Sequence, residues 1–73
     1  MIIGGKNLSE TRHLIPIKCP CCGITNVYDY DICEECLWEN DPVQRSKPYM
    51  GGGANEMSLL EAQTAYKNGI EIH

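Results

Sequence analysis

The stretch Cys19-Pro20-Cys21-Cys22-Gly23, followed by Cys33-Glu34-Glu35-Cys36, decides the fold of this 73-residue chain. Each stretch holds a CxxC pair, and ten residues separate the two pairs. Two CxxC turns joined by a spacer of hairpin length are typical of a tetrahedral metal site made of four thiolates. In the first turn the proline fixes φ, and the glycine can take the positive φ that turns the chain back. The sequence therefore predicts one metal ion bound by Cys19, Cys22, Cys33 and Cys36.

The metal is expected to be part of the fold because the chain is short. A single domain over residues 1–73 would bury only about 60% of its unfolded surface. Phe is absent, and the aromatic bulk comes from Trp38 and four Tyr. A structural zinc ion contributes roughly 10–16 kcal/mol in small zinc-binding peptides. We therefore expect the metal-free chain to be largely disordered between residues 17 and 38.

The cysteine count bears on the metal and on the cellular compartment. Five is an odd number, and residues 1–6 lack the apolar segment of a secretory signal, so a metal is favoured over disulfides. No stretch approaches the roughly 18 apolar residues of a membrane span. A reducing cytoplasm is the expected location. The expected cofactor is one Zn²⁺ per chain, and iron in a rubredoxin-like site is the alternative, because both ions accept tetrahedral sulfur ligands.

The formal net charge is −4, and acidic residues crowd the second CxxC pair. No Lys or Arg lies between Lys18 and Arg45. Because nucleic-acid binding depends on Lys and Arg that neutralise phosphates, a nucleic-acid-binding zinc ribbon is disfavoured. The acidic run is either a solvated face or a docking surface for a basic partner protein. The residues expected to form that surface are Glu34, Glu35, Glu39 and Asp41.

The predicted fold class is a small metal-stabilised α+β domain that resembles a zinc ribbon. It has two CxxC knuckles, a short β-hairpin between them and one C-terminal helix. Residues 1–12 are weakly patterned and are expected to form a loose arm. Residues 14–17 lead into the first knuckle as a short or edge strand, and residues 24–30 form the returning strand.

The second knuckle departs from the first, since Leu37 stands where the first has Gly23. Leu at positive φ is strained, so we expect a wider or helical turn there. Trp38 is expected in the core. Asp41 and the proline after it can open a short helical turn through Gln44.

The clearest predicted helix spans residues 58–68. Ser58 is its candidate N-cap, and Glu61, three residues later, completes a capping box. Gly69 is a natural stop after the last turn. Leu59, Ala62 and Tyr66 follow helical spacing and are expected to face the core.

The sequence contains no apparent nucleophile–base–acid set, and zinc held by four cysteines has no open position for water. We therefore expect a non-catalytic zinc-binding module that presents a surface to another protein. The fifth thiol, Cys21, is either a spectator in its knuckle or the redox-active thiol of a metal-linked switch, and exchanging it for Cys22 as ligand would break the CxxC spacing. His13 and His73 are expected to be bystanders, and residues 51–53 a flexible or tightly turned glycine connector.

Four motifs follow one another in a specific order along the chain: Cys19-Pro20-Cys21-Cys22-Gly23; Ile32-Cys33 with Cys36-Leu37-Trp38-Glu39; Asp41-Pro42-Val43-Gln44; and Gly52-Gly53-Ala54-Asn55 with Ser58-Leu59 and Glu61-Ala62. In this order they resemble the cysteine-rich CPCC family of small bacterial proteins, over roughly residues 17–66. The resemblance implies a metal-binding, zinc-binding domain and carries over no biochemical activity. Glu34 replaces a proline often found in the second pair of similar sequences, which leaves the ligands intact.

Overall fold

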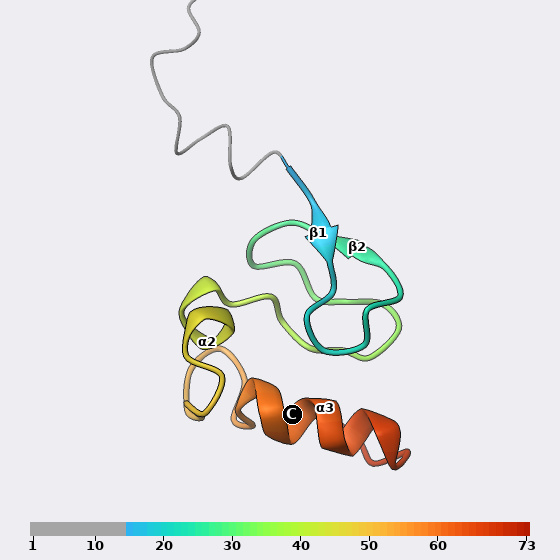
Figure 1. Cartoon of the computed structure of the whole chain (residues 1–73), viewed down its shortest axis with the longest axis vertical. Coiled ribbons are helices and arrows are strands. Elements are labelled where there is room, and N and C mark those ends of the chain that lie inside the picture. The colour runs from blue at the N-terminus through green and yellow to red at the C-terminus, as the bar shows by residue number, and fades with distance from the viewer. Residues whose placement is uncertain (1–14) are drawn as a thin grey trace, which may run out of the picture.

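The computed structural model describes residues 15–73, and the loose arm expected over residues 1–12 lies outside them. The described elements are strands β1 (Ile17–Lys18) and β2 (Asn26–Val27) and helices α2 (Pro42–Ser46) and α3 (Leu59–Lys67). In Figure 1 the loops of both CxxC pairs gather beside the hairpin, α3 lies below them and α2 lies to the left. None of the helices within residues 15–73 is long and apolar enough to cross a membrane.

The hairpin surrounds the first knuckle, residues 19–23. β1 and β2 pair antiparallel, with Ile17 opposite Val27. The Cys19 N–H donates to the Thr25 carbonyl at 2.8 Å and so closes the loop. The prediction of a hairpin between the two knuckles is therefore wrong in its placement, and the returning strand has two residues in place of the expected 24–30. Tyr30, at φ 69°, is incompatible with a strand that continues through it.

The second knuckle, residues 33–37, is closed in the same way. An isolated antiparallel bridge joins Ile32 and Glu39 on either side of it. Within that bridge the Cys33 N–H donates to the Trp38 carbonyl at 3.0 Å. Each CxxC turn is thus framed by its own short antiparallel pairing, which fixes where its sulfur atoms lie.

Helix α2 is longer than the helical turn expected from the sequence, so the fold has two described helices where one was predicted. Asp41 is its N-cap, and the Asp41 carboxylate accepts the Val43 N–H at 2.8 Å. Pro42 fits the first helical position because its missing N–H would have no partner there.

Helix α3 lies within the predicted range of residues 58–68, and its capping box is confirmed. The Ser58 hydroxyl accepts the Glu61 N–H at 3.1 Å, and the Glu61 carboxylate accepts the Ser58 N–H at 2.8 Å. Gly69 follows the helix at φ 69°, the left-handed conformation that glycine adopts without a steric penalty.

The apolar core joins the cysteines to α3. Trp38 is fully buried, as predicted, and Tyr66 is half-buried and packs against the cluster. The C-terminal residues close this core, because Ile72 is buried and the His73 carbonyl accepts the Met57 N–H at 2.9 Å. The buried members of the core are Cys19, Cys21, Val27, Cys33, Cys36, Trp38, Leu59, Ala62, Ala65 and Ile72.

A buried polar cluster holds the loop between α2 and α3. Gln44 is fully buried, and its side-chain amide donates to the carbonyls of Met50, Asn55 and Met57 at 3.0, 3.0 and 3.2 Å. Its oxygen accepts the backbone and side-chain N–H groups of Asn55 at 3.0 and 2.9 Å. Gly53 packs against this side chain so closely that a Cβ there would lie 2.8 Å from Gln44 Cδ. The glycine connector is therefore tightly turned, one of the two forms expected.

Candidate metal centre

The two knuckles bring four sulfur atoms together. The Sγ atoms of Cys19, Cys22, Cys33 and Cys36 all lie within 4.8 Å of one another. Cys19 Sγ is 3.6 Å from Cys36 Sγ, and Cys22 Sγ is 3.7 Å from Cys33 Sγ, so each pair joins one knuckle to the other. A tetrahedral ion with metal–sulfur bonds of about 2.3 Å would hold its sulfurs about 3.8 Å apart. All five cysteines are free thiols. The four residues singled out in the sequence therefore form a cluster that can hold a metal ion.

The two turns have the same backbone geometry despite their different sequences. The Gly23 N–H donates to the Cys19 carbonyl at 2.8 Å, and the Leu37 N–H donates to the Cys33 carbonyl at the same distance. Gly23 and Leu37 both have φ of 72°. The expectation of a wider or helical second turn is therefore wrong. The closing pairing around the second knuckle imposes the tight turn, and Leu37 adopts the left-handed conformation in spite of its side chain.

Hydrogen-bond donors surround the sulfur of Cys33. The Thr25 Oγ1 atom lies 3.0 Å from it, and the Glu35 N–H donates to it at 3.3 Å. Burial alone would raise the pKa of Cys33, but these contacts, the Cys36 N–H and the Cys22 thiol together lower it to about 6. The thiol of Cys33 therefore ionises readily to a thiolate, which is the form that binds a metal.

The other buried thiols of the cluster, those of Cys19 and Cys36, would need a nearby cation to ionise. Burial raises the pKa of both Cys19 and Cys36. Four thiolates packed together without a positive ion would be strongly unfavourable, because buried charges require pairing or metal coordination. A divalent cation supplies that charge and releases the thiol protons. The donor set and its spacing therefore fit a metal ion better than four neutral thiols.

Cys21 is not one of the four clustered sulfurs. Its side chain is buried, and burial raises the pKa of its thiol to about 11. A thiol with so high a pKa is mostly protonated at neutral pH and is a weak nucleophile. The geometry is that of a small apolar residue inside the first knuckle.

The four acidic residues named as an interaction surface do not share one environment. Glu34 and Glu35 are exposed, and Glu39 is half-buried. Asp41 is only 7% exposed, and its second carboxylate oxygen accepts the Ala54 N–H at 3.1 Å. The prediction that Asp41 lies on the acidic surface is therefore wrong, because its carboxylate caps α2 and binds the glycine loop.

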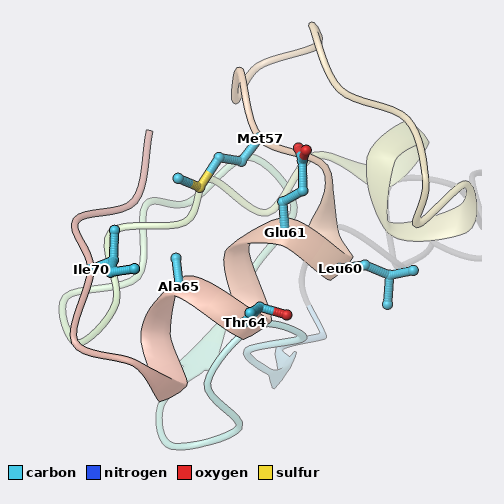
Figure 2. Close-up of a pocket in the computed structure, with 6 residues that line it drawn as sticks. All are labelled: Met57, Leu60, Glu61, Thr64, Ala65 and Ile70. Carbon is cyan, nitrogen blue, oxygen red and sulfur yellow. The ribbon is translucent and has the colours of Figure 1, made fainter.

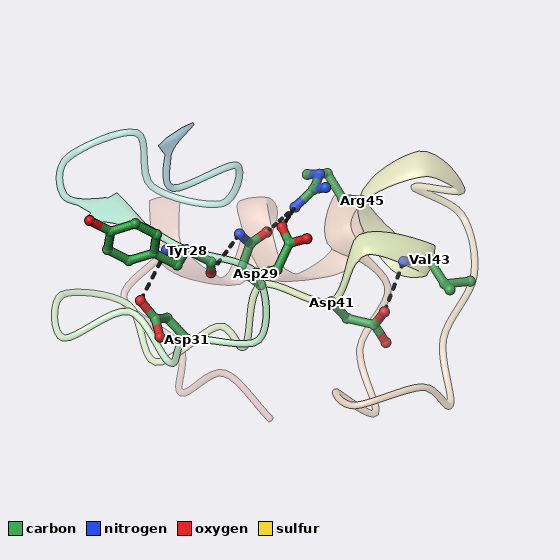
Figure 3. Close-up of polar contacts among 7 residues, drawn as sticks. Tyr28, Asp29, Asp31, Asp41, Val43 and Arg45 are labelled. Carbon is green, nitrogen blue, oxygen red and sulfur yellow. Dashed lines mark hydrogen bonds and ion pairs between the residues drawn. The ribbon is translucent and has the colours of Figure 1, made fainter. Parts of the chain in front are cut away.

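Part of the acidic run is paired within the fold. Arg45, on α2, donates to the Asp29 carboxylate at 3.1 Å and to the side-chain oxygen of Asn40 at 2.9 Å (Figure 3). Figure 3 also shows the cap between Asp41 and Val43. The charge that remains exposed beside the candidate metal centre is therefore carried mainly by Glu34 and Glu35 of the second knuckle.

Two side chains of α3 each form a hydrogen bond to one of the knuckles. Gln63 donates to the Pro20 carbonyl of the first knuckle at 2.9 Å, and the Tyr66 hydroxyl donates to the Glu35 carboxylate of the second at 2.9 Å. The sequence reasoning placed Tyr66 toward the core and gave Gln63 no role. Gln63 and Tyr66 are three residues apart and so lie on the same side of the helix. That spacing is the sequence signal that could have predicted a shared role for them.

The histidines do not join the clustered sulfurs in the described part of the chain. His13 lies outside residues 15–73. His73 is exposed, with its Nε2 atom 3.9 Å from the Glu71 carboxylate.

The chain matches a known protein family. The model of a family described as cysteine-rich CPCC matches residues 17–69, more than half of the chain. The matched span contains all four clustered cysteines, Gln44, Asn55 and helix α3. No curated protein matches the sequence.

Proposed function

Because the chain belongs to the cysteine-rich CPCC family, we propose that it is a non-catalytic, zinc-ribbon-like module. In this proposal Cys19, Cys22, Cys33 and Cys36 hold one Zn²⁺ that stabilises the fold. The folded module presents a surface to another protein, and the partner is basic and not a nucleic acid. A reducing cytoplasm would keep the ligand thiols available to the metal.

The observation that carries the proposal is the spacing of the four sulfurs, all within 4.8 Å. This arrangement favours zinc, which accepts four thiolates in tetrahedral geometry and has no redox chemistry of its own. Four protein ligands leave no coordination position for water or substrate, which supports a structural role. The exposed carboxylates of Glu34 and Glu35 support a basic partner, because complementary charge steers and orients association.

Metal analysis of the purified full chain tests the metal and its role. We expect one zinc per chain by elemental analysis and no visible absorption, whereas a ferric tetrathiolate centre would be coloured. A strong chelator should abolish the dispersed amide NMR spectrum, and added Zn²⁺ should restore it. A well-ordered sample without tightly bound metal would overturn the proposal, and so would a spectrum that survives complete metal removal. Enzymatic turnover of a small molecule would overturn the non-catalytic role.

A further inference from the structure

Two cavities meet at Ile70, beside α3. One, of about 520 Å³, has Met57, Ala65 and Ile70 around a common space, as Figure 2 shows. The other, of about 330 Å³, lies between the second knuckle and the C-terminal residues, and Leu37 and Ile70 line it. The metal-ligating candidate Cys36 also lines this second cavity. Because Ile70 lines both, we treat the two cavities as one surface and call it the Ile70 groove.

The aliphatic side chains of the groove are unusually open to solvent. Leu37 is 56% exposed and Ile70 is 58% exposed. Leu60, which lines the larger cavity, is 40% exposed. Hollow surfaces that gather exposed aliphatic side chains are typical of protein docking sites.

All the charged residues that line the groove are acidic. Glu61 lines the larger cavity, and Glu35 and Glu71 line the smaller one, with no Lys or Arg among the lining residues. Glu35 accepts a hydrogen bond from Tyr66, which is neutral and leaves the carboxylate charge uncompensated. Among residues 15–73, the one ion-pair partner within 4 Å of these three carboxylates is His73, whose Nε2 atom is 3.9 Å from Glu71 and which is charged only when protonated. The groove therefore favours a positively charged occupant.

Leu37 has a strained backbone conformation, although its side chain gains little from burial. A left-handed conformation costs a residue with a Cβ roughly 1–2 kcal/mol, and Gly23 shows that the same turn can be made by glycine. Leu37 remains 56% exposed, so burial offsets only part of that cost. Strain that persists at an exposed aliphatic residue points to a use outside folding.

We infer that the Ile70 groove docks a basic protein segment whose aliphatic side chains enter the two cavities while its Lys or Arg residues meet Glu35, Glu61 and Glu71. This inference rests on the proposed function and locates its interaction surface. Because Cys36 lines the groove, docking requires the metal-held second knuckle.

Binding of designed peptides to the zinc-loaded full chain tests this inference. The probe is a fluorescein-labelled amphipathic peptide of Leu and Lys, about four helical turns long, followed by fluorescence anisotropy. We expect it to bind, and to bind less tightly as salt rises. A Leu/Glu peptide lacks the positive charge and a Ser/Lys peptide lacks the aliphatic side chains. Each is expected to bind about tenfold more weakly or worse.

Substitutions in the protein then show where the peptide binds. Leu37→Gly and Ile70→Ser should each weaken the Leu/Lys peptide about tenfold. Ile24→Ser is the matched control, because Ile24 is 52% exposed and lines neither cavity. Glu35→Gln combined with Glu71→Gln should reduce the salt dependence, whereas Glu56→Gln, an exposed carboxylate outside the groove, should not.

Three outcomes would overturn the inference. The first is equal weakening by Ile24→Ser and Ile70→Ser, which would mean non-specific adsorption. The second is tight binding of the Leu/Glu peptide. The third is a dimer by light scattering that Ile70→Ser dissociates, which would make a second copy of this chain the occupant. Elemental analysis of every variant separates these results from the metal proposal: a docking failure with one zinc per chain leaves that proposal intact, and absence of zinc from the wild type removes it.

Discussion

Tyr66 of α3 donates its hydroxyl proton to Glu35 in the second knuckle at 2.9 Å, and this bond links the helix to the part of the chain that carries Cys33 and Cys36. Three residues earlier, Gln63 makes the corresponding link to the first knuckle. The helix therefore bridges the two halves of the candidate metal centre.

Tyr66→Phe should lower stability and remove one step of its pH dependence. The hydrogen bond to Glu35, with a smaller contribution from burial, raises the pKa of Tyr66 to about 12, above the ordinary value of 10. Because the folded chain favours the protonated phenol, this contribution is present below pH 10 and is lost as the pH rises through about 12. Urea unfolding between about pH 8 and 12 measures this contribution. Tyr49→Phe is the control, because Tyr49 is 85% exposed, and an equal effect of both variants would contradict the prediction.

Leu37→Gly and Gly23→Ala should change stability in opposite directions. Both positions have φ of 72°, so glycine relieves strain at the first and alanine introduces it at the second. We expect a gain of about 1 kcal/mol for Leu37→Gly and a loss of about 1 kcal/mol for Gly23→Ala. A Cβ at Gly23 would meet nothing within 4 Å, so the stability lost in Gly23→Ala comes only from the backbone conformation. Urea unfolding of the zinc-saturated proteins measures both, and a loss of stability in Leu37→Gly would show that its side chain packs more than its exposure indicates.

Cys22→Ser and Cys21→Ser should have different effects on zinc binding, because only Cys22 is a proposed ligand. Loss of a ligand sulfur should weaken zinc binding at least as much as loss of a supporting hydrogen bond, which costs roughly 10–100-fold. Cys21→Ser should keep one zinc per chain, because Cys21 is outside the four-sulfur cluster. Competition with a chromophoric zinc indicator measures both affinities. The reverse result would make Cys21 the fourth ligand.

Gln44→Ala should be among the most damaging substitutions outside the cysteines. It removes the partner of three backbone carbonyls and of two N–H groups of Asn55. Each buried polar group left without a partner costs about 1–3 kcal/mol, so we expect a loss of about 3 kcal/mol or more. Gln63→Ala is the control, since its half-buried side chain makes one bond, to the Pro20 carbonyl, and should cost about 1 kcal/mol. Thermal unfolding followed by circular dichroism compares them, and similar losses would show that the polar cluster is not the stronger contributor.

The parts of the fold that sequence could predict are those set by short-range chemistry. The CxxC spacing identified the four clustered cysteines, and the pattern from Ser58 to Glu61 identified the start of α3. In both cases the partners lie within a few residues of one another, or belong to a repeated local motif. Local rules of capping and turn formation are then sufficient.

The parts that sequence missed depend on contacts between distant residues. Gln44 was expected in a short helical turn and Asn55 after the glycine connector, with no contact between them, yet their side chains bind each other across 11 positions in the buried interior. Asp41 was expected both to open a helical turn and to lie on the acidic surface, but its bonds to Val43 and Ala54 keep its carboxylate within the fold. Leu37 adopts a strained φ because the bridge between Ile32 and Glu39 closes around its turn. Polar residues have no periodicity that would reveal such partners.

Trp38 is the one tryptophan of the chain, and it is completely enclosed in the cluster that also contains Cys33 and Cys36. Its indole emission should therefore report on the candidate metal centre, blue-shifted while the cluster is closed and red-shifted once water enters. Loss or uptake of a metal ion bound there would then be followed over time in the unlabelled protein, directly from its own fluorescence.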